Sequence, residues 1–324
     1  MVLKKLGIEK LQLFEKNLNP QKPEMNAFKA RIIGYGEMST VLNFDYPDLS
    51  GLAFKRMPLF RNMDEICKYE SNYKEYNNTL IKLGIKIPKY GSVSIKGRNN
   101  NMVLYLFQEL LPDYCIANKI IHNINVKHSI LIFKEILNIL SSIHKHNLKA
   151  RQNSNLIELG FDVQLSNWAV RNYNPDANII QDDISLLFFD TGTPLMKKVG
   201  IEQIDPELFL RICPSSLVWI IRRFFLKDVL SRYYDLRLII IDLIANLYKE
   251  KKEQLIESFI NVGNDYLIRN WPDILPITGK EIRNYYREDA LIWKLFLAFR
   301  KMERFIQTKM GKPYEIILPE KIER

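Results

Sequence analysis

The sequence predicts an α+β protein of two lobes, in which antiparallel strands and one helix form the first lobe and helices dominate the second. Short β-branched and aromatic runs fill the first third of the chain, whereas apolar residues recur at helical spacing through most of the rest. A length of 324 residues provides enough material for two such lobes. We expect the first lobe to span residues 1–111 and the second to span 112–324.

The first lobe should contain several short strands and one helix. The strand candidates are the runs Arg31–Ile33, Thr40–Phe44, Leu52–Lys55 and Met102–Phe107. From Ile66 to Leu83, bulky apolar residues recur every three or four positions, which predicts a helix that Gly84 ends. The segment up to Pro88 then leads back into a strand.

Helical spacing marks the second lobe. Ser129 to His144 carries apolar residues on one face, and nearly everything after Asp205 is compatible with helix between its proline and glycine breaks. Two short extended runs, 160–170 and 184–190, lie between these helical regions. We therefore expect a small strand region inside an otherwise helical lobe.

Composition excludes several classes of protein. The three cysteines, Cys67, Cys115 and Cys213, lie far apart, so neither a disulfide framework nor a cysteine zinc site is indicated. No apolar run approaches the roughly 20 residues of a membrane span, and the charged N-terminus lacks the apolar stretch of a signal peptide. A cytoplasmic protein is expected. The net charge of +10 is spread without an arginine-rich block, which makes nucleic acid an improbable partner.

The turn between the first two predicted strands contains Gly34 and Gly36. Without Cβ atoms, such a turn can bring backbone N–H groups against phosphate oxygens, although a plain β-turn explains the same glycines. A dinucleotide-binding loop fits less well, because strand-like sequence and not a helix follows. On the next strand, Lys55 shares a face with Ala53 and would point its ammonium beneath the turn, where a desolvated charge needs an anion such as phosphate. A solvated strand lysine is the alternative.

The predicted helix that follows offers two acidic partners for Lys55. Glu70 flanks the aromatic stripe of this helix, whereas Glu75 lies on a face turned further from it. We therefore prefer Glu70 as the partner, with Glu75 as the alternative.

Three polar residues of the second lobe could serve a hydroxyl nucleophile and a metal ion. Asp162 and Asn167 lie five positions apart across a short loop, where a carboxylate can accept the hydrogen bond of a hydroxyl nucleophile and an amide oxygen can coordinate Mg²⁺. Asp190 ends an apolar strand just before Gly192, so its charge needs a metal or another partner. Taken one at a time, each aspartate could equally be a turn residue that caps local N–H groups.

The order and spacing of these residues resemble the protein-kinase-like superfamily, most closely its small-molecule branch of aminoglycoside and choline phosphotransferases. The glycine-rich loop of that family is similar to Gly34, Gly36, Ser39 and Val41, and its Ala-x-Lys strand is similar to Ala53 and Lys55. Its catalytic loop resembles the segment with Asp162 and Asn167, and its Asp-Phe-Gly motif resembles Asp190-Thr-Gly192. The run from Val103 to Pro112 resembles the strand and hinge that join the two lobes, where the backbone of Glu109 and Leu111 would meet adenine.

This resemblance implies a two-lobed protein-kinase-like fold with ATP in the cleft between the lobes. Lys55 would hold the α and β phosphates, and Glu70 would orient Lys55. Asp162 would act as base or positioner, with Asn167 and Asp190 binding Mg²⁺. The implied activity is transfer of the γ-phosphoryl group to a hydroxyl of a small molecule that the sequence does not identify.

The sequence departs from the family at several positions. Gly160 and Phe161 precede Asp162 in place of His-Arg or His-Gly, and Gln164 stands where a lysine supports the transferring phosphate. Asn167 and Asp190 are 23 positions apart, which is longer than usual, so an additional hairpin or loop must be accommodated between them. The absence of an Ala-Pro-Glu motif argues against a regulated protein kinase. A catalytically inactive, nucleotide-binding pseudokinase is the first alternative, and a basic nucleic-acid-binding protein is the second.

Overall fold

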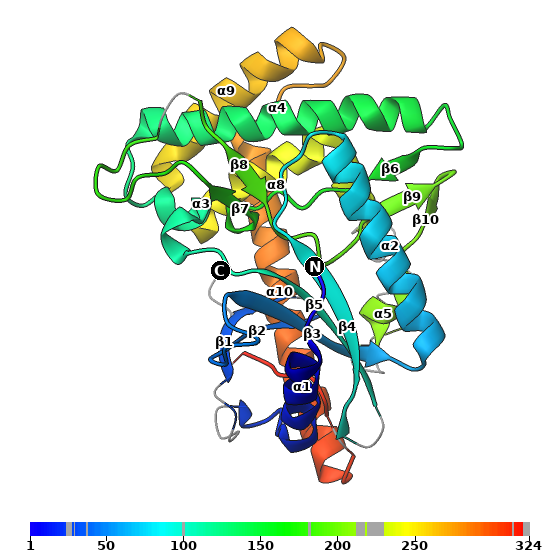
Figure 1. The fold of residues 1–324 in the computed structure, drawn as a ribbon. Coiled ribbons are helices and arrows are strands. Elements are labelled where there is room, and N and C mark those ends of the chain that lie inside the picture. Colours follow the sequence, from blue (N-terminus) through cyan, green and yellow to red (C-terminus); the bar gives the residue numbers. More distant parts are fainter. Residues whose placement is uncertain are drawn as a thin grey trace.

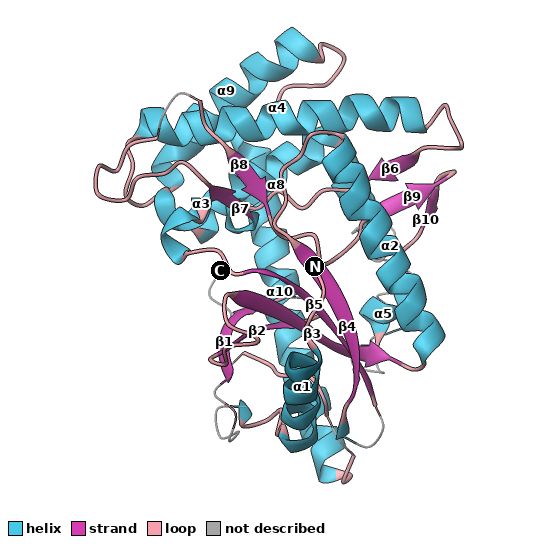
Figure 2. Ribbon diagram, in the orientation of Figure 1, coloured by secondary structure: helices cyan, strands magenta, loops and turns pink. Residues whose placement is uncertain are grey.

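A computed structural model describes residues 1–23, 28, 30–36, 38–98, 101–180, 183–211, 218, 230–312 and 314–319. It shows an antiparallel sheet with flanking helices in one lobe and a mainly helical second lobe (Figure 1), which confirms the α+β, two-lobed fold class. Figure 2 shows that long strands are confined to the first lobe, whereas the second lobe has only short ones among its helices.

Five strands form the sheet of the first lobe in the order β1-β2-β3-β5-β4, and all neighbours are antiparallel. The elements of this lobe are α1 (Lys5–Asn17), β1 (Ala30–Tyr35), β2 (Thr40–Phe44), β3 (Leu52–Phe60), α2 (Met63–Lys82), β4 (Tyr90–Lys96) and β5 (Met102–Glu109). The four predicted strands are confirmed, and β4 is the strand expected after Pro88.

The helix α1 was not predicted from the sequence. Its residues Leu11 and Phe14 pack on the outer face of the sheet, where Phe14 meets the ring of Phe44 edge-on at 5.0 Å. Charged residues interrupt every apolar run in this segment, which hid the helix. The three-residue spacing of Leu11 and Phe14 on one face was the available signal.

The helix α2 begins and ends at residues suited to those positions. The side chain of Asn62 accepts a hydrogen bond from the backbone N–H of Glu65 at its start. At its end Gly84 has a φ of 79°, and its N–H donates to the carbonyl of Ile81 at 2.9 Å. The predicted helix end at Gly84 is confirmed.

The second lobe surrounds one large hydrophobic core, in which the ring of Phe133 stacks on that of Phe259. Its elements are η3 (Asp113–Cys115), α3 (Ala117–Ile120), α4 (Val126–Ala150), β6 (Ile157–Leu159), η4 (Leu165–Asn167), β7 (Trp168–Val170), β8 (Leu186–Phe188), β9 (Met196–Lys198), β10 (Ile201–Glu202), α5 (Pro206–Leu210), η6 (Arg232–Tyr234), α8 (Leu236–Lys249), η7 (Glu253–Leu255), α9 (Ile256–Asn270) and α10 (Gly279–Lys309). The predicted helix 129–144 lies within α4. Cys213 lies outside the described residues.

The helix α10 connects the two lobes. It packs against α8 in the second lobe and runs along the molecule to the first (Figure 1), where Phe296 joins the cluster on the inner face of the sheet. The chain then returns to the sheet. Ile317 joins the hydrophobic cluster on the outer face of the sheet, the outer core, and its carbonyl accepts from the Thr40 hydroxyl at 3.3 Å. The first lobe therefore includes residues near the end of the chain, and the boundary at residue 111 stays a prediction.

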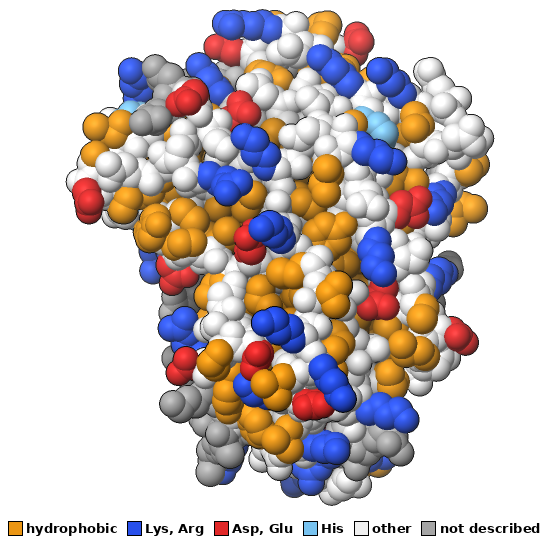
Figure 3. All heavy atoms as spheres, in the orientation of Figure 1, with side chains coloured by type: hydrophobic (Ala, Val, Ile, Leu, Met, Phe, Trp, Pro, Cys, Tyr) orange, Lys and Arg blue, Asp and Glu red, His pale blue; other side chains and the backbone are white. Residues whose placement is uncertain are grey.

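Positive charge is dispersed on the one face of the molecule that Figure 3 draws. On the face drawn in Figure 3, Lys and Arg side chains are scattered among acidic and hydrophobic ones. Among the described residues, no helix is both long and apolar enough to cross a bilayer.

Candidate functional site

The alternation of β3 directs neighbouring residues to opposite faces of the sheet. Phe54 belongs to the outer core under α1, whereas Met57 belongs to the inner cluster beside α2. Lys55 shares the inner face with Ala53 and Met57, as the sequence predicts, and its side chain remains 20% exposed. The inner face of β3 thus carries the ammonium toward the second lobe.

Lys55 forms an ion pair there with Asp190, which follows β8. The two residues are 135 positions apart, so the contact joins the lobes directly. Gly192 makes this approach possible, because a Cβ at that position would lie 2.9 Å from the Lys55 ammonium nitrogen. A larger residue at this position would therefore have to displace the Lys55 side chain from its present place.

The β7–β8 pairing brings Asn167 beside the Asp190 segment. Trp168 pairs with Phe188, and the N–H of Phe189 donates to the carbonyl of Asn167 at 3.0 Å. The long connection between these two paired strands accounts for most of the 22 positions between Asn167 and Asp190. Trp168 is fully buried and packs in the core of the second lobe.

Asp162 lies in the same loop and is linked to Asn167. The Asn167 side-chain amide donates to the backbone carbonyl of Asp162 at 3.1 Å, and the N–H of Gln164 donates to the Asp162 carboxylate at 3.4 Å. Desolvation, followed by the charges of Asp242 and Asp190, raises the pKa of Asp162 from 3.8 to about 7. A carboxyl group with such a pKa can exchange a proton near neutral pH.

The helix α2 presents tyrosines to this site. The Tyr69 hydroxyl donates to the carbonyl of Gly192 at 2.8 Å, and burial raises the pKa of Tyr69 far above its usual range. Neither Glu70 nor Glu75, both described, forms an ion pair with Lys55. Glu75 instead pairs with Lys198 at 2.7 Å, so Glu75 is not the partner of Lys55 in this structure. The pairing of Glu70 with Lys55 stays a prediction, because the carboxylate that Lys55 meets here is Asp190.

The glycine turn lies at the tip of the β1–β2 hairpin. Gly34 is opposite Val41, and the N–H of Gly36 donates to the carbonyl of Ser39 at 2.9 Å, which closes the turn. Met38 is buried in the inner-face cluster together with Tyr69. The turn is therefore anchored over the same face of the sheet that carries Lys55.

The predicted hinge follows β5. The N–H of Glu109 donates to the carbonyl of Lys89 at 3.1 Å, so Glu109 could offer an adenine ring only its own carbonyl. Leu111 packs with Cys115 and Leu187 near the start of the second lobe.

Asn167 and Asp190 could hold Mg²⁺ only together with ligands from outside the protein. Across the described ranges, no group of three or more His, Cys, Asp or Glu side chains could hold a metal ion. The Asn167 amide nitrogen is held by the Asp162 carbonyl, which orients the amide oxygen as a ligand. Mg²⁺ commonly takes one or two protein oxygens and completes its shell with water and phosphate, so the two residues fit this cation when a nucleotide is bound.

Two residues that influence Asp162 were missed by sequence reasoning. Asp242, on α8, makes the largest contribution of any charge to the raised pKa of Asp162, while Arg232 lowers that pKa. Both lie about 70 to 80 positions beyond Asp162, so no local spacing links them to it. The available signal was a carboxylate inside an otherwise apolar helical run, because such a charge needs a reason to be there.

Together, the fold and these contacts define a two-lobed α+β protein in which Lys55, Asp162, Asn167 and Asp190 lie where the lobes meet. A family profile described as "Family of unknown function (DUF6206)" matches residues 29–304, and the chain belongs to this family. No curated protein matches the chain. A solved structure entitled "WaaP in complex with acyl carrier protein" is 13% identical, with 80% of this chain and 98% of that chain covered at a TM-score of 0.35. A match at this level carries no argument about activity.

Proposed function

We propose that this protein transfers the γ-phosphoryl group of ATP to a hydroxyl of a small molecule and depends on Mg²⁺. One observation carries the proposal, a chain of contacts that runs across both lobes. Lys55 forms an ion pair with Asp190, the neighbouring Phe189 donates a backbone hydrogen bond to Asn167, and the Asn167 side chain donates to the Asp162 carbonyl. Four residues suited to phosphoryl transfer, drawn from both lobes, therefore lie along one line of contacts. A merely structural arrangement has little need for all four.

In the proposed site, ATP lies between the glycine turn and the Asp190 segment. Gly34, Gly36, Ser39 and Val41 cover its phosphates, and Ala53 and Leu111 border the adenine, which the backbone of Glu109 and Leu111 meets. Lys55 moves its ammonium from Asp190 to the phosphates. Asp190 and Asn167 then hold Mg²⁺, whose charge offsets that of the phosphates.

Asp162 acts as the base or positioning group for the acceptor hydroxyl. Its raised pKa makes the carboxylate a better proton acceptor than an ordinary aspartate. The carboxyl must be ionised to accept a proton, so we expect the rate to rise with pH through about 7. A pH profile of ATP turnover tests this dependence directly.

Calorimetric titration of ATP with Mg²⁺ tests the nucleotide site. Wild type should bind only when Mg²⁺ is present, whereas Lys55→Ala and Asp190→Ala should weaken binding by about tenfold or more. Lys10→Ala is the matched control, because it removes another lysine of an ion pair, at 2.8 Å from Asp48 and away from the cleft. Unchanged binding by both cleft variants, with the fold checked by circular dichroism, would exclude the proposed site.

A nucleotide-binding protein without turnover is the second candidate. The observation in its favour is the inner face of α2, which offers Tyr69 to the site while Glu70 makes no ion pair with Lys55. Measurement of ADP release separates the two candidates. The phosphotransferase predicts ADP release that Asp162→Asn lowers by about 10² or more, whereas the second candidate predicts binding with no release in either protein.

A nucleic-acid-binding protein is the weakest alternative, since the basic residues on the face of Figure 3 form no single patch. It predicts binding to RNA or DNA that falls steeply with salt and survives Lys55→Ala.

A further inference from the structure

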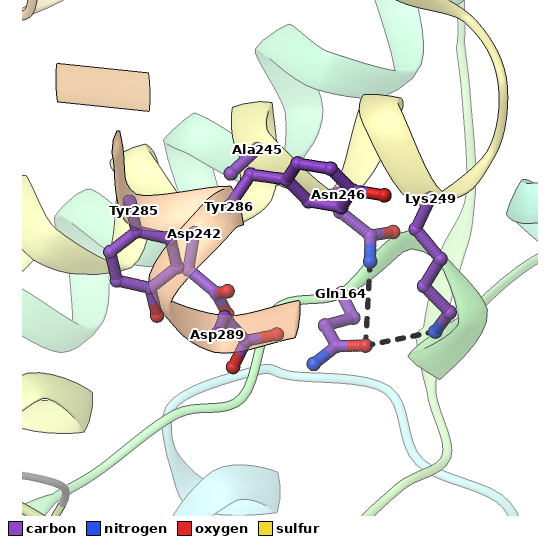
Figure 4. Close-up of a pocket in the computed structure, with 8 residues that line it drawn as sticks. All are labelled: Gln164, Asp242, Ala245, Asn246, Lys249, Tyr285, Tyr286 and Asp289. Atoms are coloured by element: carbon purple, nitrogen blue, oxygen red, sulfur yellow. Dashed lines mark hydrogen bonds between the residues drawn. The ribbon is translucent and has the colours of Figure 1, made fainter. Parts of the chain in front are cut away.

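A shallow hollow lies where the Asp162 loop meets α8 and α10. Gln164 of the loop, Asp242 and Lys249 of α8, and Tyr285 and Asp289 of α10 contribute to its wall (Figure 4). The hollow is open to solvent, so a ligand bound there would lie against its wall with one face in water.

The hollow adjoins Asp162 through Gln164. The backbone N–H of Gln164 donates to the Asp162 carboxylate at 3.4 Å, and the side chain of the same residue lines the hollow. Asp242 lies across the hollow from Gln164 (Figure 4). A molecule bound against Gln164 is therefore close to the carboxylate that would receive its hydroxyl proton.

Charges of both signs surround the hollow. Asp242, Asp289 and Lys249 line it, and Asp289 lies 3.8 Å from Arg232. The Lys249 ammonium donates to the Gln164 side-chain oxygen at 3.2 Å. Because cations stand beside the carboxylates, the charge of the wall does not itself favour a cationic or an anionic ligand.

The wall offers hydrogen-bond donors, acceptors and aromatic rings together. In Figure 4, Asp242, Asp289 and the Tyr285 phenol lie on one side, and the Gln164 amide with Lys249 lies on the other. The Tyr285 hydroxyl is buried and, among the described residues, has no hydrogen-bond partner, although buried polar groups are nearly always bonded. Tyr286 is held in place by stacking on Tyr248, with ring centroids 4.9 Å apart.

We propose that this hollow is the acceptor site and that the acceptor is a small, uncharged, polyhydroxylated compound such as a sugar or cyclic polyol. Adjacent hydroxyls both donate and accept, as the carboxylates, amides and ammonium of the wall require, and a carbon ring suits the tyrosine faces. The proposal rests on the phosphotransferase function. An acceptor oxygen attacks the γ-phosphorus, its proton passes to Asp162, and the bond to the bridging oxygen breaks, so that ADP leaves with the electron pair.

Saturation-transfer NMR with defined probes tests the acceptor class. The neutral probes are glucose, galactose and myo-inositol, and the charged analogues are glucosamine and glucuronate, each at millimolar concentration with and without ATP and Mg²⁺. We expect at least one neutral probe to bind, to be phosphorylated when ATP is present, and to bind about tenfold more tightly than the charged analogues. Preference for a charged analogue, or binding of no neutral probe, would overturn the proposal.

Matched variants locate the binding. Tyr285→Phe and Asp289→Asn should each weaken the neutral probe about tenfold, the effect of one lost hydrogen bond, while ATP binding is unchanged. Tyr266→Phe, which removes a hydroxyl on α9 away from the hollow, should change neither. Equal loss in all three variants, or no loss in the first two, would place the probe elsewhere. Absence of ATP binding in wild type with retained probe binding would instead defeat the phosphotransferase function and leave the hollow as a polyol site.

Discussion

Lys55 and Arg56 are adjacent in β3, carry the same charge and differ in almost every other respect. Arg56 points to the outer face, where its side chain is 1% exposed and bonded to Glu15 at 2.6 Å and to the Glu315 carbonyl at 2.6 Å. Glu15 also accepts from the Tyr105 hydroxyl. Lys55 points to the inner face, is 20% exposed and meets one carboxylate, Asp190, which is 33% exposed.

The difference separates a charge that holds the fold from one that can change partners. The outer pair is surrounded by further hydrogen bonds, so breaking it leaves a buried charge with no water to solvate it. The inner pair is open to solvent, and either member can be solvated or take a phosphate or a cation when the other leaves. The same strand therefore supplies a structural and an exchangeable ion pair on its two faces.

The largest expected effect is that of Arg56→Ala. This substitution leaves the buried carboxylate of Glu15 without its cationic partner, and we expect the free energy of unfolding to fall by about 3–5 kcal/mol. Urea unfolding followed by circular dichroism measures this change. The double variant Arg56→Met with Glu15→Leu should recover most of the loss, because no uncompensated charge remains; a loss below about 1 kcal/mol in Arg56→Ala would contradict the structural role.

The second effect is a gain of stability at the proposed base. Between pH about 4 and about 7 the folded protein retains the Asp162 proton that the unfolded chain has lost, so this group's contribution to stability falls as pH rises. Asp162→Asn carries no such charge. It should be more stable than wild type by about 2 kcal/mol at pH about 8 and similar to it at pH about 4. Urea midpoints at the two pH values test the sign, and a difference that does not grow with pH would refute it.

The third effect is a small loss of stability when the exposed ion pair on β3 is removed. Lys55→Met should lower the free energy of unfolding by no more than about 1 kcal/mol, since the Asp190 carboxylate remains accessible to water. The same urea experiment as for Arg56→Ala measures it. A loss as large as that of the arginine variant would show that both faces are structural.

The smallest effect is expected at the glycine turn. A Cβ on Gly34 would make ordinary contacts, 3.6 Å from Val41, so Gly34→Ala should alter stability by no more than about 0.5 kcal/mol. Its ATP binding should nevertheless weaken, because the phosphates need the space of the missing side chain. Unaltered ATP affinity would assign the glycine to the turn alone.

Much of the fold could be predicted because periodicity reports local structure. The strands of the sheet and the helix ending at Gly84 follow from spacing and from a residue suited to a positive φ. The helix α1 escaped because its apolar face is narrow and interrupted by charge. The returning segment near Ile317 could not be foreseen, since its contacts with the sheet are tertiary and leave no spacing in the sequence.

The residues of the site also fall into those that the sequence predicts and those that only the folded structure brings together. Asp162, Asn167 and Asp190 were singled out by motif order, and the structure places them along one line of contacts with Lys55. Their neighbours Arg232 and Asp242 come from elements far along the chain, so folding alone brings them to the loop. The partner expected on α2 depended on which face of a helix is turned inward, and there Tyr69 faces the site.

The long helix α10 gives the molecule a second connection between its lobes, besides the segment after β5 (Figure 1). The helix α2 adds further contacts between the lobes, since the Tyr76 hydroxyl donates to the Gly160 carbonyl at 2.9 Å and Glu75 pairs with Lys198 at 2.7 Å. Separation of the lobes would have to bend or shift a 31-residue helix and break these contacts as well. We therefore expect Lys55 to exchange Asp190 for another partner by movement of side chains, with the lobes held together.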